Sequence, residues 1–427
     1  MPDRVVVANP GGERHLRDVA AAFAEVGDLD LYISTAGYGI SQVADLPRTI
    51  PGPVAEKLKV ELKRRAVTDQ VGARAIRIGT TLEVTNVALS RLPLPKPLKF
   101  IAYRPARLSF DYRASRRLER GMDAVIGSQG TTMRIFARAG ELGIGRVLDY
   151  PIAHYRFTEA VLEEEVRLKP DWAATMRVYK YPDWVRRRYV REIEMAERII
   201  MVSGHHQQNF AEAGIDPGRT FIVPWYVDSQ LFTPAEHEDE TAFRVAFVGE
   251  LSQRKGLSYL IDGFERAALP DSELLLIGRT HAVTGPWADR PRVRHVPPMP
   301  NFMLPDVLRG CHVIALPSLV EGFPVSILEG MACGLPAIIS ENIGRDIVED
   351  GKEGFVVPIR DPDAIAERLA ELHADTARRR EMARAARAKA ETFTKERNQE
   401  ALRQGVRDML AERRGETRAV AGASAAV

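Results

Sequence analysis

The chain has 427 residues, of which 45% are hydrophobic and 28% are charged. This length predicts two or three domains, and the composition excludes disordered, collagenous and coiled-coil proteins. The two cysteines, Cys311 and Cys333, argue against a disulfide framework or a cysteine-rich zinc site and favour a reducing compartment. No apolar run approaches the roughly 18 residues of a membrane span, and the N-terminus lacks the pattern of a signal peptide. We therefore expect a cytoplasmic protein that meets a membrane only at its surface.

The net charge is +2, but basic residues gather in one stretch. Residues 51–120 contain 16 Lys or Arg and 6 Asp or Glu, so this stretch carries +10 and the rest of the chain −8. One interpretation is a solvated basic surface. The other is contact with anionic lipid at the inner face of the membrane or with an acidic glycan, because Phe100, Tyr103, Phe110 and Tyr112 lie among the cations. We expect no nucleic-acid partner, since the rest of the chain is acidic and shows no nucleic-acid-binding motif.

Short apolar runs recur along the chain, each followed by a helical pattern. In chain order, these runs are 5–9, 29–35, 123–128, 146–150, 198–203, 221–224, 244–249, 273–278, 293–296, 312–317, 337–340 and 354–357. Continuous rather than alternating apolar residues are typical of strands that are covered on both faces. The segments between them are amphipathic, with stripes such as Leu257, Leu260, Ile261 and Phe264. This alternation predicts parallel sheets with helices on both sides.

The pattern breaks at about 224–242, a segment that is rich in proline and acidic residues. We therefore expect an α/β protein with two doubly wound, Rossmann-like domains, 1–225 and 226–395. A charged helix and a disordered tail are expected in 396–427. Sheets of this kind bind ligands at the carboxyl ends of their strands, so the two domains should face each other across a shared cleft.

The most informative segment, 317–338, contains two glutamates, Glu321 and Glu329. We expect a turn and then a helix over 325–332, with Pro324 in its first turn. The two carboxylates would lie roughly 12 Å apart along the helix axis. An elongated ligand reaches both while its anionic middle rests on the N–H groups of the helix N-terminus. A nucleotide diphosphate sugar has this shape.

A second segment, 247–264, has the pattern of strand, loop and helix. Arg254 and Lys255 lie in its loop, just before the helix. A diphosphate leaving group needs positive charge wherever no metal supplies it, and these two side chains are placed to give it. An Arg-Lys pair in a loop is by itself more often a solvated surface feature. The acidic segment in the same domain favours the phosphate-binding interpretation.

Together these segments resemble the family-4 retaining glycosyltransferases, which have the two-domain GT-B fold. The resemblance covers nearly the whole chain and rests on EGFPVSILE (321–329), VGELSQRKG (248–256) and the linker VPWYVDSQLFTP (223–234). It implies transfer of a sugar from a UDP- or GDP-type nucleotide sugar to a hydroxyl of a glycan or lipid-linked acceptor, with retention of anomeric configuration. It also implies a place in cell-surface polysaccharide or glycolipid synthesis, with no cofactor.

The resemblance implies roles for individual residues as well. Glu321 holds the sugar hydroxyls, Glu329 the ribose, and Lys255 the diphosphate. His154 corresponds to the family's active-site histidine, so that His154, Lys255 and Glu321 are the catalytic candidates. The remaining candidates are Gly249, Arg254, Gly322, Phe323 and Pro324 on the donor side and Gly11 and Gly12 on the acceptor side.

The chain departs from the family at Glu250, where an arginine often follows the strand glycine. Arg254 then supplies the missing cation, or the donor phosphates are held differently. This departure keeps open a non-catalytic nucleotide-sugar-binding subunit that supports a partner transferase. A further alternative is another GT-B enzyme, such as a nucleotide-sugar epimerase or a hydrolase of the same donor.

Some of these residues also have structural interpretations. In the structural interpretation, His154 is a half-buried histidine that follows a strand, and Gly11-Gly12 forms a tight turn. His205 and His206 are adjacent, so their side chains point in different directions and indicate structural roles. Asp28-Leu29-Asp30 and Asp361-Pro362-Asp363 match the Asp-x-Asp pattern of metal-dependent glycosyltransferases, but both lie at predicted helix ends. We therefore predict no catalytic metal.

Overall fold

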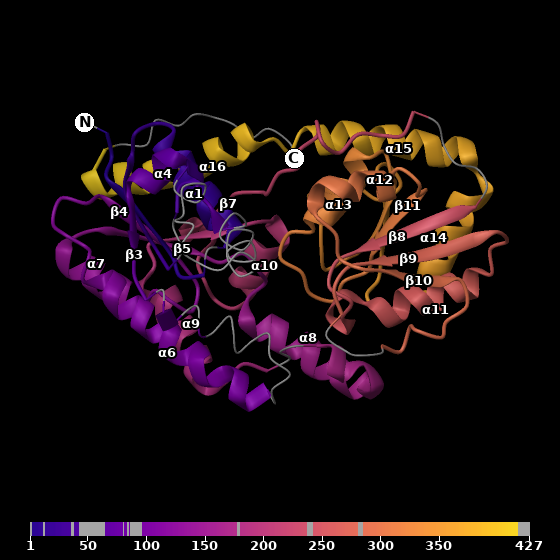
Figure 1. The fold of residues 1–427 in the computed structure, drawn as a ribbon, viewed down its shortest axis with the longest axis horizontal. Helices are drawn as coiled ribbons and strands as arrows, with labels where there is room; N and C mark the ends of the chain where they lie inside the picture. Colours follow the sequence, from indigo (N-terminus) through magenta and orange to yellow (C-terminus); the bar gives the residue numbers. More distant parts are fainter. Residues whose placement is uncertain are drawn as a thin grey trace, which may run out of the picture.

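Parallel strands and helices alternate along the whole chain, as the apolar runs predict. The computed structural model describes residues 2–11, 13–35, 38–41, 65–79, 81–82, 85, 96–176, 180–236, 242–280 and 285–416. Figure 1 shows two lobes side by side, the N-terminal lobe in indigo to magenta and the C-terminal lobe in orange. Each lobe is built on its own parallel sheet.

The sheet of the N-terminal lobe has seven strands in the order β3-β2-β1-β4-β5-β6-β7. They are β1 (Val5–Asn9), β2 (Leu29–Ser34), β3 (Ala75–Arg77), β4 (Ala124–Ser128), β5 (Gly145–Asp149), β6 (Arg198–Met201) and β7 (Thr220–Ile222). The sequence predicts each of them except β3, whose three residues are too few to form a pattern and are not buried.

Helices cover both faces of this sheet. They are α1 (Arg14–Ala24), α4 (Asp69–Ala73), α6 (Lys96–Ser115), α7 (Met133–Leu142), α9 (Asp183–Met195), α10 (Gly204–Glu212) and, from the end of the chain, α16 (Lys395–Arg414). Helix α8 (Tyr155–Leu168) instead lies against the C-terminal lobe, where Glu165 accepts from Gln253 Nε2 at 2.7 Å. Val5 and Val7 of β1 lie in one core cluster with α1 and α16, whereas Val6 and Ala8 lie in another with α6, α7 and α10. Both faces of β1 are therefore buried, as its unbroken apolar run predicts.

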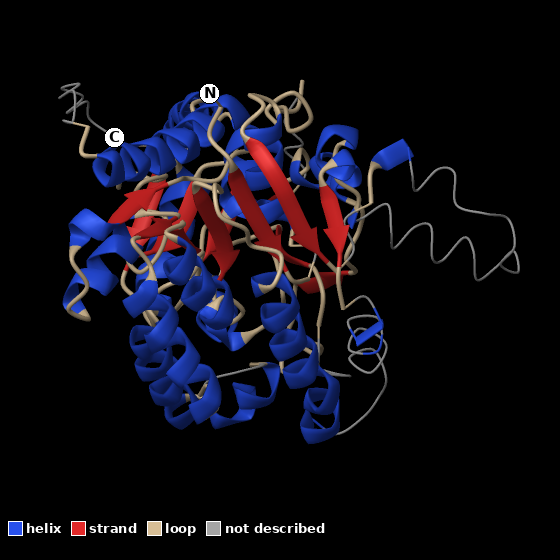
Figure 2. Ribbon diagram, turned by 90° about the vertical axis from the view of Figure 1, so that its left-hand side faces the viewer, coloured by secondary structure: helices blue, strands red, loops and turns tan. Residues whose placement is uncertain are grey.

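The sheet of the C-terminal lobe has six strands in the order β10-β9-β8-β11-β12-β13. They are β8 (Phe243–Val248), β9 (Ser272–Ile277), β10 (Val293–Val296), β11 (Val313–Leu316), β12 (Ala337–Ser340) and β13 (Gly354–Val357). The helices of this lobe are α11 (Leu257–Ala267), α12 (Leu304–Leu308), α13 (Val325–Ala332), α14 (Pro362–Ala374) and α15 (Thr376–Glu391). Figure 2 shows strands with helices on either side of them. The structure thus has the two Rossmann-like sheets that the sequence predicts.

The chain crosses between the lobes twice. The first crossing follows β7, and the second leads from α15 into α16, which lies against α1 of the N-terminal lobe (Figure 1). The two crossings touch, because the N–H of Val227 donates to the carbonyl of Phe393 at 3.2 Å. Phe393 also lies against Phe323, with ring centroids 6.0 Å apart. Both connections therefore meet beside the turn that precedes α13.

All strands of each sheet are parallel. At one place in each sheet, however, the chain that follows one strand leads to one half of the sheet, and the chain that follows its neighbour leads to the other half. In the N-terminal lobe this place lies between β1 and β4, and in the C-terminal lobe between β8 and β11. The loops that leave the carboxyl ends of such a pair diverge and open a crevice, where α/β sheets bind ligands. In the C-terminal lobe these loops begin at Gly249 and Pro317, and they carry the predicted donor-side residues except Glu329, which lies in α13.

The basic region 51–120 is described only at 65–79, 81–82, 85 and 96–120. Within these parts Phe110 is 1% exposed and packs in the core. The expectation that it lies among cations on a membrane-facing surface is therefore wrong. Tyr112, in contrast, is 46% exposed. Of the helices within the described ranges, none is both long and apolar enough to span a membrane.

Candidate active site

Lys255 and Glu321 meet at the crevice between β8 and β11. Lys255 Nζ lies 2.9 Å from Glu321 Oε2, and Arg254 Nη1 lies 3.3 Å from Glu321 Oε1. The side chains of Lys255 and Glu321 are 11% and 13% exposed. The structure therefore brings together three of the predicted site residues from two distant segments of the sequence.

Local structure holds the two cations in place. A 3₁₀ turn over 253–255 follows Ser252, whose hydroxyl accepts from the Arg254 N–H at 3.4 Å. Gly256 ends this turn with φ +68°, and a Cβ there would lie 2.0 Å from the Pro317 carbonyl oxygen. Only glycine fits this close approach between the two loops. Arg254 Nη1 also donates to the Val320 carbonyl at 2.7 Å, which fastens its loop to the one that carries Glu321.

Gly249 follows β8 and lies beside the Lys255 side chain. Its φ is +151°, and a Cβ there would lie 2.9 Å from Lys255 Nζ and 3.1 Å from Cε. A larger residue would therefore push Lys255 away from Glu321. Gly249, predicted to lie on the donor side, thus leaves the space that the Lys255 side chain occupies.

Glu321 is a carboxylate at every physiological pH. Burial alone would raise its pKa, but Arg254 and Lys255 beside it lower the pKa to about 2. Burial by itself would lower the pKa of the Arg254 guanidinium. The nearby charges of Glu321 and, to a smaller extent, Glu250 outweigh this effect and raise the pKa above its ordinary value. Two cations, Arg254 and Lys255, thus face two carboxylates, Glu321 and Glu250, at this crevice.

The carbonyl of Glu321 is held by the N-terminal lobe. His206 Nε2 lies 2.9 Å from this oxygen, and burial lowers the pKa of His206 to about 4. A carbonyl oxygen only accepts, so the neutral ring donates from Nε2. The prediction of a structural role for His206 missed this link between the lobes, because no sequence spacing relates it to Glu321.

Gly322 lies close to the N-terminal lobe at this site. A Cβ at Gly322 would lie 2.3 Å from the Pro151 carbonyl oxygen. Phe323, 4% exposed, lies against Trp225 of the first crossing, with ring centroids 6.2 Å apart. Pro324 is the N-cap residue of α13, and so it lies just before the helix and not in its first turn as predicted.

Glu329 lies in a different environment from Glu321. It lines an interdomain cavity of about 270 Å³ that is bounded by α13, by α1 of the N-terminal lobe and by the first crossing. Burial raises the pKa of Glu329 to about 7, although Asn301 and Arg14 partly oppose this. A carboxyl group with this pKa both donates and accepts hydrogen bonds near neutral pH.

Replacing Glu329 with glutamine should stabilise the protein at high pH. The native pKa of about 7 lies above the ordinary value of 4.5, so the native state binds the extra proton between these two values. Stability is therefore lost as pH rises from 4.5 to 7, by up to about 3 kcal/mol. We expect Glu329→Gln to raise the unfolding midpoint at pH 8 and to leave it unchanged at pH 4.5.

Thermal unfolding at several pH values measures this difference. Glu349→Gln is the matched control, since the Glu349 side chain is 70% exposed. An equal effect of both substitutions across the pH range would show that burial does not raise the pKa of Glu329.

His15 and Asp149 face Glu329 across the interdomain cavity, and the sequence did not reveal them. His15 Nε2 lies 2.7 Å from Asp149 Oδ2, and the His15 ring stacks on Trp225 at 5.5 Å. Burial opposes protonation, but Asp149 raises the pKa of His15 to about 9. The pair is therefore ionic at neutral pH. The one signal in the sequence was Asp149 itself, a carboxylate that ends an apolar strand.

His154 is the N-cap residue of α8, three residues after Pro151. It is 3% exposed, its Nδ1 accepts from the Arg156 N–H at 3.4 Å, and its ring lies 4.9 Å from that of Phe210. Burial, and then the charge of Arg156, lower its pKa to about 4. His154 is therefore neutral, and it lies on the loop that approaches Gly322.

Gly11, predicted to lie on the acceptor side, follows β1 at the crevice of the N-terminal lobe. A Cβ at Gly11 would lie 3.9 Å from Arg107 Nη2, an ordinary van der Waals contact. Arg107, Pro151 and Arg188 line a cavity of about 190 Å³ here. Gly12, the other predicted residue, lies outside the described residues.

Both Asp-x-Asp patterns have structural partners. Asp361 Oδ1 accepts from the Ala364 N–H at 2.9 Å, which confirms it as the N-cap of α14. Asp30 pairs with Arg4 at 2.9 Å. In the part of the chain that the structure describes, no three His, Cys, Asp or Glu side chains are close enough together to hold a metal ion.

Residues 242–375 match the family model of the glycosyl transferases group 1. Curated relatives include D-inositol 3-phosphate glycosyltransferase of Mycolicibacterium gilvum, 30% identical over 43% of this chain and 46% of the relative. Another is alpha-maltose-1-phosphate synthase of Mycolicibacterium smegmatis, 30% identical over 48% of this chain and 60% of the relative. The chain spans about half the length of the curated relatives it matches.

Solved structures share the fold over nearly the whole chain. Sucrose-phosphate synthase from Thermosynechococcus elongatus has a TM-score of 0.64 at 17% identity and covers 96% of this chain and 100% of its own. Anabaena Alr3699/HepE, solved in complex with UDP and glucose, has a TM-score of 0.58 at 16% identity with the same coverage. The lipopolysaccharide galactosyltransferase WaaB gives 0.60 at 14% identity, covering 96% of this chain and 99% of its own. The expected GT-B fold is confirmed.

Proposed function

We propose that this chain, whose residues 242–375 are a glycosyl transferases group 1 domain within a GT-B fold, is a retaining glycosyltransferase that uses a nucleotide diphosphate sugar. One observation carries the proposal: Lys255, Arg254 and Glu321 meet at the crevice between β8 and β11. Cations that neutralise a departing diphosphate stand there beside a carboxylate that accepts from sugar hydroxyls.

Donor binding redistributes these contacts. The sugar hydroxyls donate to the Glu321 oxygen that Lys255 contacts in the structure. The flexible Lys255 side chain then turns Nζ toward the diphosphate. Because Glu321 stays ionised, it remains an acceptor throughout. Glu329 binds the ribose at the other end of the ligand.

The transfer step needs no protein base. The bond between the anomeric carbon and the diphosphate oxygen breaks as the sugar becomes oxocarbenium-like. The departing oxygen takes the proton of the acceptor hydroxyl, whose oxygen then bonds to the same face of the sugar. The protein orients both reactants, neutralises the diphosphate and excludes water where the lobes meet at Gly322 and Pro151.

We propose a UDP- or GDP-type donor and a glycan or lipid-linked acceptor in cell-surface polysaccharide or glycolipid synthesis. Support for a UDP-sugar comes from Anabaena HepE, solved with UDP and glucose. The acceptor binds at the crevice of the N-terminal lobe, near Gly11 and Arg107. Contact of the basic region 51–120 with anionic lipid would bring a lipid-linked acceptor to this crevice.

A panel of nucleotides and nucleotide sugars tests the donor site. A ligand at 100 times its dissociation constant adds about 2.7 kcal/mol to the free energy of unfolding, so the true donor should raise the unfolding midpoint most. Incubation with that donor and candidate acceptors should then release the nucleoside diphosphate and give a product of unchanged anomeric configuration by NMR. A product of inverted configuration, or no stabilisation by any nucleotide sugar, would refute the proposal.

The second candidate, a non-catalytic nucleotide-sugar-binding subunit, rests on Glu250. This carboxylate faces Arg254 where the family often has an arginine. Such a subunit would be stabilised by the donor but would turn it over only with a partner chain. Donor turnover by the purified single chain decides against it.

A further inference from the structure

The turn that carries Lys255 is fastened to a helix from the N-terminal half of the chain. Gln253, the first residue of this turn, is 0% exposed. Its Nε2 donates to Glu165 Oε1 at 2.7 Å, and Glu165 of α8 is 0% exposed as well. Two distant segments of the sequence thus meet through buried polar side chains, two residues before Lys255.

The other polar groups of Gln253 also have partners. Its Nε2 donates to Ser258 Oγ at 2.6 Å, and its Oε1 accepts from the Ser258 N–H at 3.1 Å. Ser258 lies in the first turn of α11, where N–H groups have no partner within the helix. The backbone N–H of Gln253 donates to Thr175 Oγ1 at 3.0 Å. Gln253 therefore fixes the turn to α11 on one side and to the N-terminal half of the chain on the other.

Glu165 is held in place by partners of its own. Its Oε2 accepts from Arg360 Nε at 2.8 Å in an ion pair, and its Oε1 accepts from the Tyr259 hydroxyl at 3.0 Å. Arg360 Nη2 donates further to the Val161 carbonyl of α8 at 3.1 Å. A buried carboxylate is stable when it is paired and hydrogen-bonded in this way. Glu165 is therefore a fixed anchor for Gln253.

The segment around Glu165 packs on the C-terminal lobe. Trp172, in the 3₁₀ turn Pro170–Thr175 that follows α8, belongs to the core of that lobe, and its ring lies 5.8 Å from that of Trp287. Glu165 therefore holds Gln253 from within the same body that carries the proposed donor site.

Lys255 depends on this turn more than Arg254 does. Arg254 is anchored on the neighbouring loop, because its Nη1 donates to the Val320 carbonyl at 2.7 Å and its carbonyl accepts from the Leu319 N–H at 2.9 Å. Lys255 Nζ contacts Glu321 at 2.9 Å, and in the proposed donor complex it leaves this carboxylate for the diphosphate. The backbone of the turn then decides where the lysine side chain begins and how closely Nζ approaches the departing oxygen.

We propose that Gln253, anchored by Glu165, is a positioning residue for Lys255. This inference rests on the proposed function, in which Lys255 neutralises the departing diphosphate. A group that stabilises developing charge acts best when it is in place before the reaction. A displacement of about 1 Å at a reacting centre costs on the order of 100-fold in rate, so partial loss of the anchor should cost about tenfold.

Gln253→Met tests this role. Methionine has a similar length and lacks the amide, so three hydrogen bonds of the side chain are lost while Glu165 keeps Arg360 and Tyr259. We expect kcat per folded molecule to fall about tenfold. In a Lys255→Ala background the same substitution should lower kcat by less than about twofold, because the group that Gln253 positions is absent.

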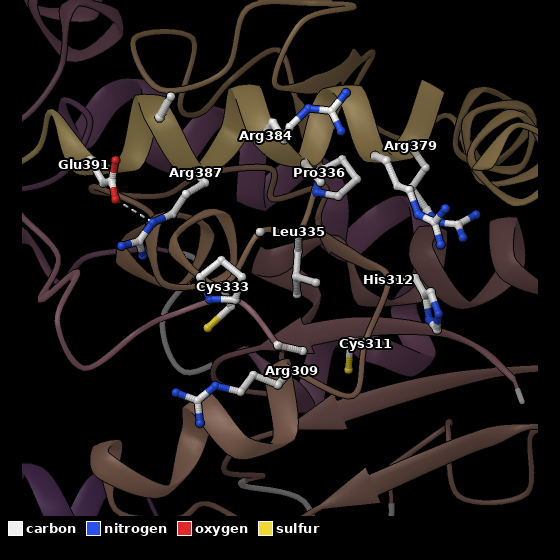
Figure 3. Close-up of a pocket in the computed structure, with 16 residues that line it drawn as sticks. Arg309, Cys311, His312, Cys333, Leu335, Pro336, Arg379, Arg384, Arg387 and Glu391 are labelled. Carbon is white, nitrogen blue, oxygen red and sulfur yellow. Dashed lines mark hydrogen bonds and ion pairs between the residues drawn. The ribbon is translucent and has the colours of Figure 1, made fainter. Parts of the chain in front are cut away.

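Arg309→Met is the matched control. Arg309 lies in the same lobe beside a cavity of about 400 Å³ at the amino ends of β11 and β12, whereas Lys255 lies at the carboxyl ends of the strands (Figure 3). It also makes three side-chain hydrogen bonds, two with Thr233 and one with Asp306. Arg309→Met should lower the unfolding midpoint and leave kcat per folded molecule unchanged.

Thr175→Val tests the same turn if Gln253→Met does not fold. It removes the hydroxyl that accepts from the Gln253 N–H and keeps the shape of the side chain. We expect a lower kcat than in the unmodified protein, again only while Lys255 is present. Thr175→Ser keeps the hydroxyl and should keep the unmodified rate.

NMR of protein with isotope-labelled lysine reports the position of Lys255 without turnover. The resonance of its ε-CH₂ group is the one that is lost in Lys255→Ala. This resonance should shift in Gln253→Met and stay in place in Arg309→Met. If it shifts although Lys255→Ala turns over donor at the unmodified rate, Gln253 positions the lysine but the proposed function is wrong. An unshifted resonance, or an equal loss of kcat with and without Lys255, would overturn the inference.

Discussion

Lys255→Ala should lower kcat by roughly 100- to 1,000-fold, because removing one group that stabilises the developing charge costs about 2.7–4 kcal/mol in comparable sites. The effect on folding should be far smaller. Arg254 remains 3.3 Å from Glu321, so the buried carboxylate keeps a cation beside it. Release of nucleoside diphosphate under saturating donor measures kcat, and thermal unfolding measures stability.

Lys352→Ala is the matched control for this experiment. It removes the same charge from an exposed lysine that pairs with Glu349 at 3.0 Å, so both kcat and the unfolding midpoint should stay near those of the unmodified protein. Unimpaired turnover in Lys255→Ala would remove Lys255 from the site. Equal losses of kcat and of folded protein would indicate that its main role is structural.

The sequence predicts the individual segments of the proposed donor site well. The helix over 325–332 forms with these bounds, because Pro324 precedes it and Gly334, at φ +79°, ends it. The loop with Arg254 and Lys255 follows a strand whose apolar run is unbroken. Local patterns of this kind depend on neighbours in the sequence, so one sequence is sufficient to detect them.

The contacts between segments could not be predicted in the same way. Lys255 reaches Glu321 because β8 and β11 are neighbours in the sheet while β9 and β10 continue on the other side. The hydrogen bond from His206 to Glu321 further depends on how the two lobes sit together. Neither arrangement leaves a period or a spacing in the sequence. The family resemblance placed Lys255 and Glu321 at one donor site but predicted neither their contact nor the role of His206.

The charge at the cleft also differs from the sequence-based picture. The sequence predicts that Arg254, Lys255, Glu321 and Glu329 all contact one bound ligand. In the structure, Glu321 is ionised and paired, whereas burial raises the pKa of Glu329 to about 7. Opposite environments therefore give the two carboxyl groups different protonation states, and the difference arises from their partners and not from their spacing.

Gly322→Ala should impair closure of the cleft and leave the folding of the two lobes unchanged. An added Cβ would lie 2.3 Å from the Pro151 carbonyl oxygen, so the loop with Glu321 must move away from the N-terminal lobe. A displacement of about 1 Å at a reacting centre costs on the order of 100-fold in rate, and we expect kcat to fall by this amount. The cores of the two lobes do not include this contact, so the unfolding midpoint should change little.

Gly310→Ala provides the comparison, because its added Cβ would meet the Val307 carbonyl oxygen at an ordinary 3.6 Å in the same lobe. This variant should keep both kcat and the unfolding midpoint. Small-angle scattering of Gly322→Ala with donor bound should show a more open arrangement of the lobes than in Gly310→Ala. If Gly322→Ala instead turns over donor at the unmodified rate, the approach of Gly322 to Pro151 is not part of the working state. Water exclusion at the transfer step would then have to come from other contacts between the lobes, of which the hydrogen bond between His206 and Glu321 is the next to test.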